Sequence, residues 1–164
     1  MSKRELEERI TYLEDVEAIK QLMAEYCDIA DEDHNADRIV GIFTEDGVWD
    51  GGEDGVARGH DELRALFDRF RAEISFSQHN VFNHRIRVDG NTAHHDCNFF
   101  GAFTFRESNA RCWLLARSVD LCVKVDGQWK LKHHKGYGMA YPFEEGWPLD
   151  DPAEGFANQQ WRGP

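Results

Sequence analysis

The chain is short of basic residues. Its 164 residues include 19 Lys and Arg against 31 Asp and Glu, which gives a formal net charge of −12. Because nucleic acids and anionic membranes bind clustered Lys and Arg, this balance argues against both as partners. Long hydrophobic runs are missing too, so no stretch reaches the length of a membrane span. The beginning of the chain, MSKRELEER, is charged and is unlike a secretory signal.

Cysteine is also scarce and forms no motif. The four cysteines, Cys27, Cys97, Cys112 and Cys122, make no CxxC pair, so the sequence signals neither a zinc site nor a redox site. We expect reduced, mostly buried thiols in a cytoplasmic protein. No GxSxG-like motif occurs, and none of the cysteines has an activating neighbour in sequence. These absences disfavour nucleophilic catalysis.

The first part of the chain has the hydrophobic spacing of helices. Apolar residues recur at steps of three and four from Leu6 to Tyr26, which is typical of an amphipathic helix. Asp15 is a candidate cap at a break, so we predict a short leading helix and a main helix over residues 16–30. Asn35 is expected to cap a short helix, and Asp61 a further one. A short strand is predicted at 48–50, followed by a flexible glycine-rich loop.

The second part has the period of two that is typical of strands. We predict four strands, at residues 79–88, 92–105, 112–125 and 128–137. The turns Asp89-Gly90-Asn91 and Asp126-Gly127 favour hairpins, so the strands should be antiparallel neighbours. Helices followed by a long-stranded sheet indicate an α+β fold, with a curved sheet wrapped around the helices as a cone. We predict one domain over residues 1–164, with an irregular tail from about residue 142.

Three side chains suggest acid–base chemistry: Tyr26, Asp31 and His79. A carboxylate that binds one imidazole nitrogen fixes the tautomer and stabilises the imidazolium formed when the other nitrogen takes a proton. The simpler alternatives are a core tyrosine, a solvated acidic run around Asp31, and a structural histidine. Residues 26 and 31 lie about 140° apart on an ideal helix, so both reach one cavity only if the helix ends or distorts near Asp31.

Two histidine-rich stretches are tempting as metal ligands: His94-His95-Asp96 and His133-His134. Adjacent residues of a strand point to opposite faces of the sheet, so neither stretch can chelate one ion alone. We therefore expect no metal site. The sequence leaves open whether His133 or His134 faces a cavity.

Several features together resemble one family. They are Tyr26 and Asp31 at the end of the first long helix, TEDG after the next helical stretch, HxxxN at His79, and the hairpin sequence DGQWKL. Over about residues 13–141 this order is similar to the SnoaL-like branch of the NTF2-like (cystatin-like α+β barrel) superfamily. It looks nearest to bile-acid 7α-dehydratases, scytalone dehydratase and hexachlorocyclohexane dehydrochlorinase.

The resemblance implies a cavity between sheet and helices, catalysis without a cofactor, and a homo-oligomer, with a trimer favoured over a dimer. It places Asp31 and His79 on the family's catalytic dyad and Tyr26 on the tyrosine of the bile-acid dehydratases. Asn83 matches an asparagine that follows the dyad histidine. His134 falls roughly where relatives place a cationic residue.

The expected activity is a lyase, most simply a dehydratase. Trp49 and Phe103 are among the aromatic residues expected to line an apolar pocket, which suits a small hydrophobic molecule, cyclic or aromatic. In this hypothesis His79 removes a proton, Asp31 holds His79, and Tyr26 assists the leaving hydroxyl. An isomerase or polyketide cyclase is the first alternative, and a non-catalytic small-molecule-binding module is the second.

Overall fold

The computed structural model describes residues 2–52 and 55–140 and has a mixed α+β fold. The helices are α1 (Lys3–Asp31), α2 (Ala36–Ile42) and α3 (Gly59–Glu73). The strands are β1 (Phe43–Asp50), β2 (Val56–Arg58), β3 (Ile74–Asp89), β4 (Thr92–Phe105), β5 (Arg111–Val125) and β6 (Gln128–Ala140). The tail predicted from about residue 142 lies outside the described residues.

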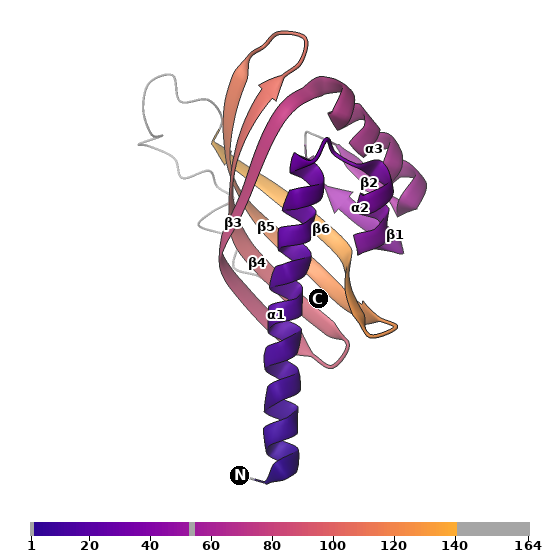
Figure 1. The fold of residues 1–164 in the computed structure, drawn as a ribbon, viewed down its shortest axis with the longest axis vertical. Helices are drawn as coiled ribbons and strands as arrows, with labels where there is room; N and C mark the ends of the chain where they lie inside the picture. The colour runs from indigo at the N-terminus through magenta and orange to yellow at the C-terminus, as the bar shows by residue number, and fades with distance from the viewer. Residues whose placement is uncertain (1, 53–54, 141–164) are drawn as a thin grey trace.

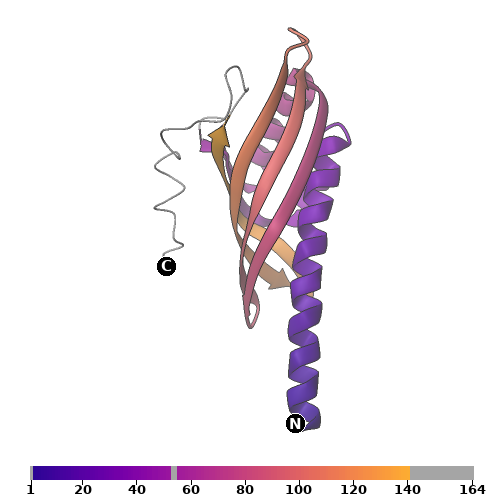
Figure 2. The same cartoon turned by 90° about the vertical axis from the view of Figure 1, so that its left-hand side faces the viewer.

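The strands form one six-stranded sheet in the order β2-β1-β6-β5-β4-β3. Strands β3 to β6 are an antiparallel meander, while β1 joins β6 in parallel and β2 closes the edge. The sheet curves, and the helices lie on one side of it (Figures 1 and 2). The predicted curved sheet wrapped around helices is confirmed. No helix in the described part of the chain is long and apolar enough to cross a membrane.

Helix α1 is continuous, so the predicted break at Asp15 is wrong. Ser2 caps the helix in a capping box with Glu5, and the first turns extend beyond the sheet (Figures 1 and 2). Asp15 is buried in the middle of the helix, where its Oδ1 accepts a hydrogen bond of 2.9 Å from the Trp129 indole and pairs with Lys124. The Asp15 carboxylate therefore links α1 to the β5–β6 hairpin.

Loss of the Asp15 carboxylate should destabilise the fold measurably. In Asp15→Ala the buried Trp129 N–H has no acceptor, and we expect the free energy of unfolding to fall by about 1–3 kcal/mol. Urea unfolding followed by tryptophan fluorescence measures this. The matched control is Glu14→Ala, at an exposed position one residue earlier. Equal stability of the two variants would contradict the role given to Asp15.

The other predicted helix caps and strand boundaries are confirmed in part. Asn35 caps α2 as predicted, since its side chain accepts from the Arg38 N–H at 3.0 Å. Helix α3 begins at Gly59, so Asp61 lies in the first turn and is not its cap. The sheet also begins earlier than predicted: β3 starts at Ile74, which places His79 inside the strand, and β2 was not expected.

A bulge in β3 reverses which side chains face the helices. Before it, Ser77, His79 and Val81 point toward the helices; after it, His84 and Ile86 do. The register with β4 shifts between Phe82 and Arg85, and Asn83 has a φ of 58°, in the left-handed region that asparagine tolerates better than most residues. The bulge therefore inserts one residue and exchanges the two faces of the strand.

Candidate active site

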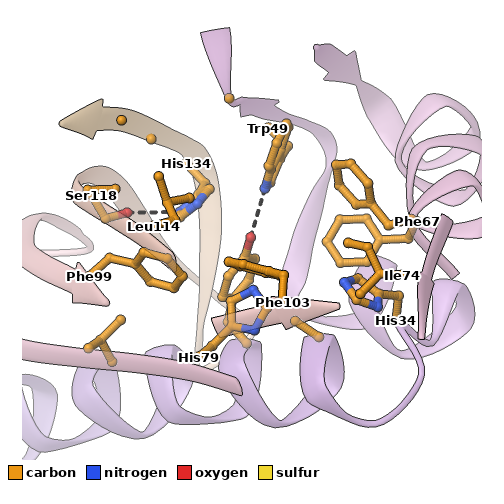
Figure 3. A pocket seen from close by; sticks show the side chains of 18 of the residues that line it. His34, Trp49, Phe67, Ile74, His79, Phe99, Phe103, Leu114, Ser118 and His134 are labelled. Carbon is orange, nitrogen blue, oxygen red and sulfur yellow. Dashed lines mark hydrogen bonds between the residues drawn. The ribbon is translucent and has the colours of Figure 1, made fainter. Parts of the chain in front are cut away.

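A cavity of about 340 Å³ lies between the end of α1, helix α3 and the sheet. Most side chains around it are apolar or aromatic, and they come from distant parts of the chain. Those labelled in Figure 3 are His34, Trp49, Phe67, Ile74, His79, Phe99, Phe103, Leu114, Ser118 and His134. Its volume is typical of a small-molecule site.

Asp31, the last residue of α1, attaches the helix to β3. Its carboxylate accepts the His79 backbone N–H at 3.0 and 2.9 Å and the Gln78 side-chain amide at 3.3 Å. One residue earlier, the Ala30 carbonyl accepts the Ser77 hydroxyl at 3.0 Å. The backbone contacts hold Asp31 in place independently of the His79 side chain.

The same carboxylate also binds the His79 imidazole. Asp31 Oδ1 lies 2.6 Å from His79 Nδ1, a hydrogen-bonding distance. Asp31 thereby favours the tautomer with the proton on Nδ1 and leaves Nε2 as the free nitrogen of a ring that lines the cavity. The rings of Phe99 and Phe103 pack against the imidazole at centroid distances of 5.2 and 5.3 Å. This geometry suits His79 as a base in an apolar environment.

A glycine makes this close aromatic packing feasible. Gly101 pairs directly with His79 in the β3–β4 register. A Cβ added at Gly101 would lie 2.7 Å from both the Phe99 and Phe103 rings. Any larger residue there would push one of the rings away from its present position.

Tyr26 lines the cavity about 1.4 helical turns before Asp31. The Trp49 indole N–H donates a 2.8 Å hydrogen bond to the Tyr26 oxygen, so the phenol proton remains available to another acceptor (Figure 3). Burial raises the pKa of Tyr26 well above its usual range, which keeps the phenol protonated. Helix α1 ends at Asp31, as the sequence analysis required. Tyr26 lines the cavity itself, whereas Asp31 contacts the His79 ring that lines it.

His134 faces the cavity, and His133 is not among the residues lining it. The His134 ring packs on Tyr26 at a centroid distance of 4.7 Å. Its Nδ1 lies 2.7 Å from Asp120 Oδ1 and 3.3 Å from the Ser118 hydroxyl (Figure 3 shows the latter). His134, a cavity residue, thus forms a second carboxylate–imidazole pair with the buried Asp120, which the sequence analysis did not foresee.

Asp120 is fully buried and binds two imidazoles. Its other oxygen lies 2.7 Å from His95 Nδ1. Burial alone raises the pKa of a carboxyl group, but His134 and His95 outweigh it and lower the pKa of Asp120 to about 2. The buried carboxylate is therefore ionised at neutral pH, with the two imidazoles as its hydrogen-bond partners.

His34 is the site residue that sequence analysis missed most clearly. It follows the acidic run Asp31-Glu32-Asp33, which looked solvated, yet its ring is buried against Phe67 and Phe70. Left-handed backbone at Asp33 and His34 turns the ring into the cavity, 6.2 Å from His79. Burial, and secondarily the neighbouring His79, lowers the pKa of His34 to about 4, so the ring is neutral at pH 7.

Of the other residues predicted to bind substrate, two line the cavity and one does not. Trp49 and Phe103 line the cavity as expected. Asn83 does not: it is exposed and lies outside the cavity, because the bulge turns its side chain away from the helices. Among the described residues, the one group of three side chains placed to hold a metal ion also lies outside the cavity, at His84, His95 and Cys97.

Comparison with known proteins agrees with this architecture. The sequence profile of the SnoaL-like domain matches residues 11–135. The chain belongs to the SnoaL-like family. No curated protein has a significantly similar sequence.

Several solved structures share the fold of this SnoaL-like protein, and one of them is named as an NTF2-like superfamily protein. A candidate scytalone dehydratase from Novosphingobium aromaticivorans is 21% identical, with a TM-score of 0.77 over 89% of this chain and 97% of that one. A hexachlorocyclohexane dehydrochlorinase from Novosphingobium barchaimii is 18% identical, with a TM-score of 0.75 over 88% and 99%. An NTF2-like protein from Salmonella enterica is 16% identical, with a TM-score of 0.68 over 79% and 94%. At these identities the likeness shows the fold.

Proposed function

We propose that this SnoaL-like protein is a lyase that eliminates water, or another small leaving group, from a hydrophobic cyclic or aromatic substrate without a cofactor. The observation that carries the proposal is the 2.6 Å contact between Asp31 and His79 at the wall of an apolar cavity. A binding protein needs apolar walls but has no use for an oriented base.

In this proposal, His79 Nε2 removes a proton from a carbon that is made acidic by an adjacent carbonyl or conjugated ring. The electron pair of that C–H bond forms the new double bond as the bond to the leaving oxygen breaks. The Asp31 carboxylate stabilises the imidazolium, and the Tyr26 hydroxyl donates a hydrogen bond to the departing oxygen. The proton removed and the hydroxide released together make up the eliminated water.

The printed names of two structural neighbours support this reaction class. One is a candidate scytalone dehydratase and the other a dehydrochlorinase, and each name describes an elimination. The aromatic lining supports an apolar substrate. Tyr26 and His134 supply the polar groups that would orient the oxygen substituents of that substrate.

Product mass tests the proposal. The protein is incubated with a panel of hydroxylated cyclic compounds, and the products are analysed by mass spectrometry. We expect a product that has lost the mass of one water molecule. A product of unchanged mass would favour the isomerase or cyclase alternative, and tight binding without any product would favour the binding module.

Tyr26→Phe should lower the rate of elimination with little effect on binding. The variant keeps the aromatic packing but removes the donor to the leaving oxygen, and we expect kcat to fall by about 10²-fold at nearly constant KM. Steady-state kinetics on the active compound measures this. The matched control is Trp49→Phe, which removes the indole donor but keeps the Tyr26 hydroxyl and should cost less. An unchanged kcat in Tyr26→Phe would exclude Tyr26 as the donor.

A further inference from the structure

Three metal-ligating side chains meet outside the cavity, on the face of the sheet that the helices cover. They are His84 of β3 and His95 and Cys97 of β4, and one ligand atom from each lies within 4.8 Å of the others. His95 and Cys97 are fully buried, whereas His84 is half-buried, which leaves an approach from solvent. The proposed elimination uses none of the three.

The bulge in β3 creates this cluster. His95 and Cys97 are two residues apart on one strand, so their side chains share a face. A regular β3 that keeps His79 facing the helices would turn His84 to the opposite face. The extra residue at Asn83, with its φ of 58°, reverses this and brings His84 beside His95.

The imidazole of His95 is already oriented as a ligand. Its Nδ1 lies 2.7 Å from Asp120, so its Nε2 points the other way, to 2.9 Å from His84 Nδ1. A histidine that binds a metal through one nitrogen commonly donates the proton of its other nitrogen to a carboxylate. Without an ion, two facing ring nitrogens form a hydrogen bond only by sharing one proton.

Charge balance also favours an ion here. A divalent ion bound with one thiolate would carry a net charge of +1, and it would lie across the His95 ring from the buried Asp120 carboxylate.

We propose that His84, His95 and Cys97 bind a divalent transition-metal ion of the Zn²⁺ type, with Asp120 orienting His95 and a water completing the coordination. Nitrogen and sulfur donors select such ions over Mg²⁺ and Ca²⁺. Bound there, the ion links the bulge of β3 to β4. The site could not be recognised from the sequence. His95 and Cys97 are separated by one residue on β4, and His84 reaches them only because of the bulge in β3.

Cobalt binding tests the site without any substrate. The full chain is stripped of metal with a chelator under reducing conditions and titrated with Co²⁺. We expect the charge-transfer absorption of a cobalt–thiolate bond to saturate at one ion per chain and to disappear when Zn²⁺ displaces the cobalt. Binding should release protons, because the thiol must deprotonate, and the affinity should fall as the pH is lowered. Calorimetry in two buffers of different ionisation enthalpy measures the released protons.

Variants identify the ligands. Cys97→Ala should abolish the cobalt–thiolate band, and His84→Ala should weaken Zn²⁺ binding by about 100-fold or more, the upper end of the effect of removing an outer-shell partner. His94→Ala is the matched control, because His94 adjoins His95 on β4 but points to the opposite face. Absence of the band in the wild-type protein would overturn the proposal, as would Zn²⁺ affinity equal in His84→Ala and wild type. If circular dichroism shows that Cys97→Ala does not fold, the wild-type cobalt band and the Zn²⁺ affinity of His84→Ala still decide whether the site exists.

Discussion

Replacement of His79 by alanine is expected to lower the rate of elimination by about 10²- to 10⁴-fold, the range that a positioned general base contributes. The His79 Nδ1 is bound to the Asp31 carboxylate at 2.6 Å, while the other nitrogen of this cavity-lining ring has no hydrogen-bond partner among the described residues. Without it, no other side chain can take the proton with Asp31 stabilising the resulting charge. Steady-state kinetics on the active compound of the substrate panel measures the loss.

This substitution separates catalysis from folding unusually well. The His79 backbone N–H still donates to both oxygens of Asp31, so the end of α1 stays attached to β3 in the variant. The matched control is His133→Ala, which removes an imidazole that does not line the cavity and should leave the rate within a factor of a few. Equal rates for His79→Ala and wild type, with both folded by circular dichroism, would refute the proposed mechanism.

Removal of the Asp120 carboxylate is expected to cause the largest loss of stability. Asp120→Ala leaves the buried Nδ1 atoms of His95 and His134 without their acceptor, and breaking a buried ion pair from one side typically costs about 3–5 kcal/mol. Urea unfolding at neutral pH measures the change. Glu107→Ala, which removes an exposed acid in the β4–β5 turn, should change the free energy of unfolding by less than about 0.5 kcal/mol.

The pH dependence of stability provides an independent check on Asp120. Its pKa falls from an ordinary value of 3.8 to about 2 in the folded state. The carboxylate therefore contributes its stability fully above about pH 4 and loses it as the pH falls through about 2. Asp120→Asn keeps the shape but cannot titrate, so its stability should vary less than that of wild type across this window. Identical acid-unfolding profiles would contradict the lowered pKa.

The sequence by itself determined the elements with strong local signals. The period of two and the turns at Asp89-Gly90-Asn91 and Asp126-Gly127 predicted the β3–β6 meander, with β4 bounded at the observed residues. These signals are local because a hairpin turn is specified by its own few residues. The α+β class followed from the order of helical and strand patterns. The pairing of Asp31 with His79 followed from the resemblance to the SnoaL-like family, since no local signal joins residues 48 positions apart.

The tertiary structure decided the remaining features, and each depends on a contact between distant segments. Asp15 looked like a cap because its partners, Trp129 and Lys124, lie on the last hairpin. His34 gave no sequence signal because the aromatic rings that bury it come from α3. Asn83 and His84 exchanged faces because a bulge forms between two strands, and period-two alternation in one strand cannot reveal an extra residue relative to its neighbour. Alternation along a strand specifies its two faces, whereas pairing with the next strand decides which of them meets the helices.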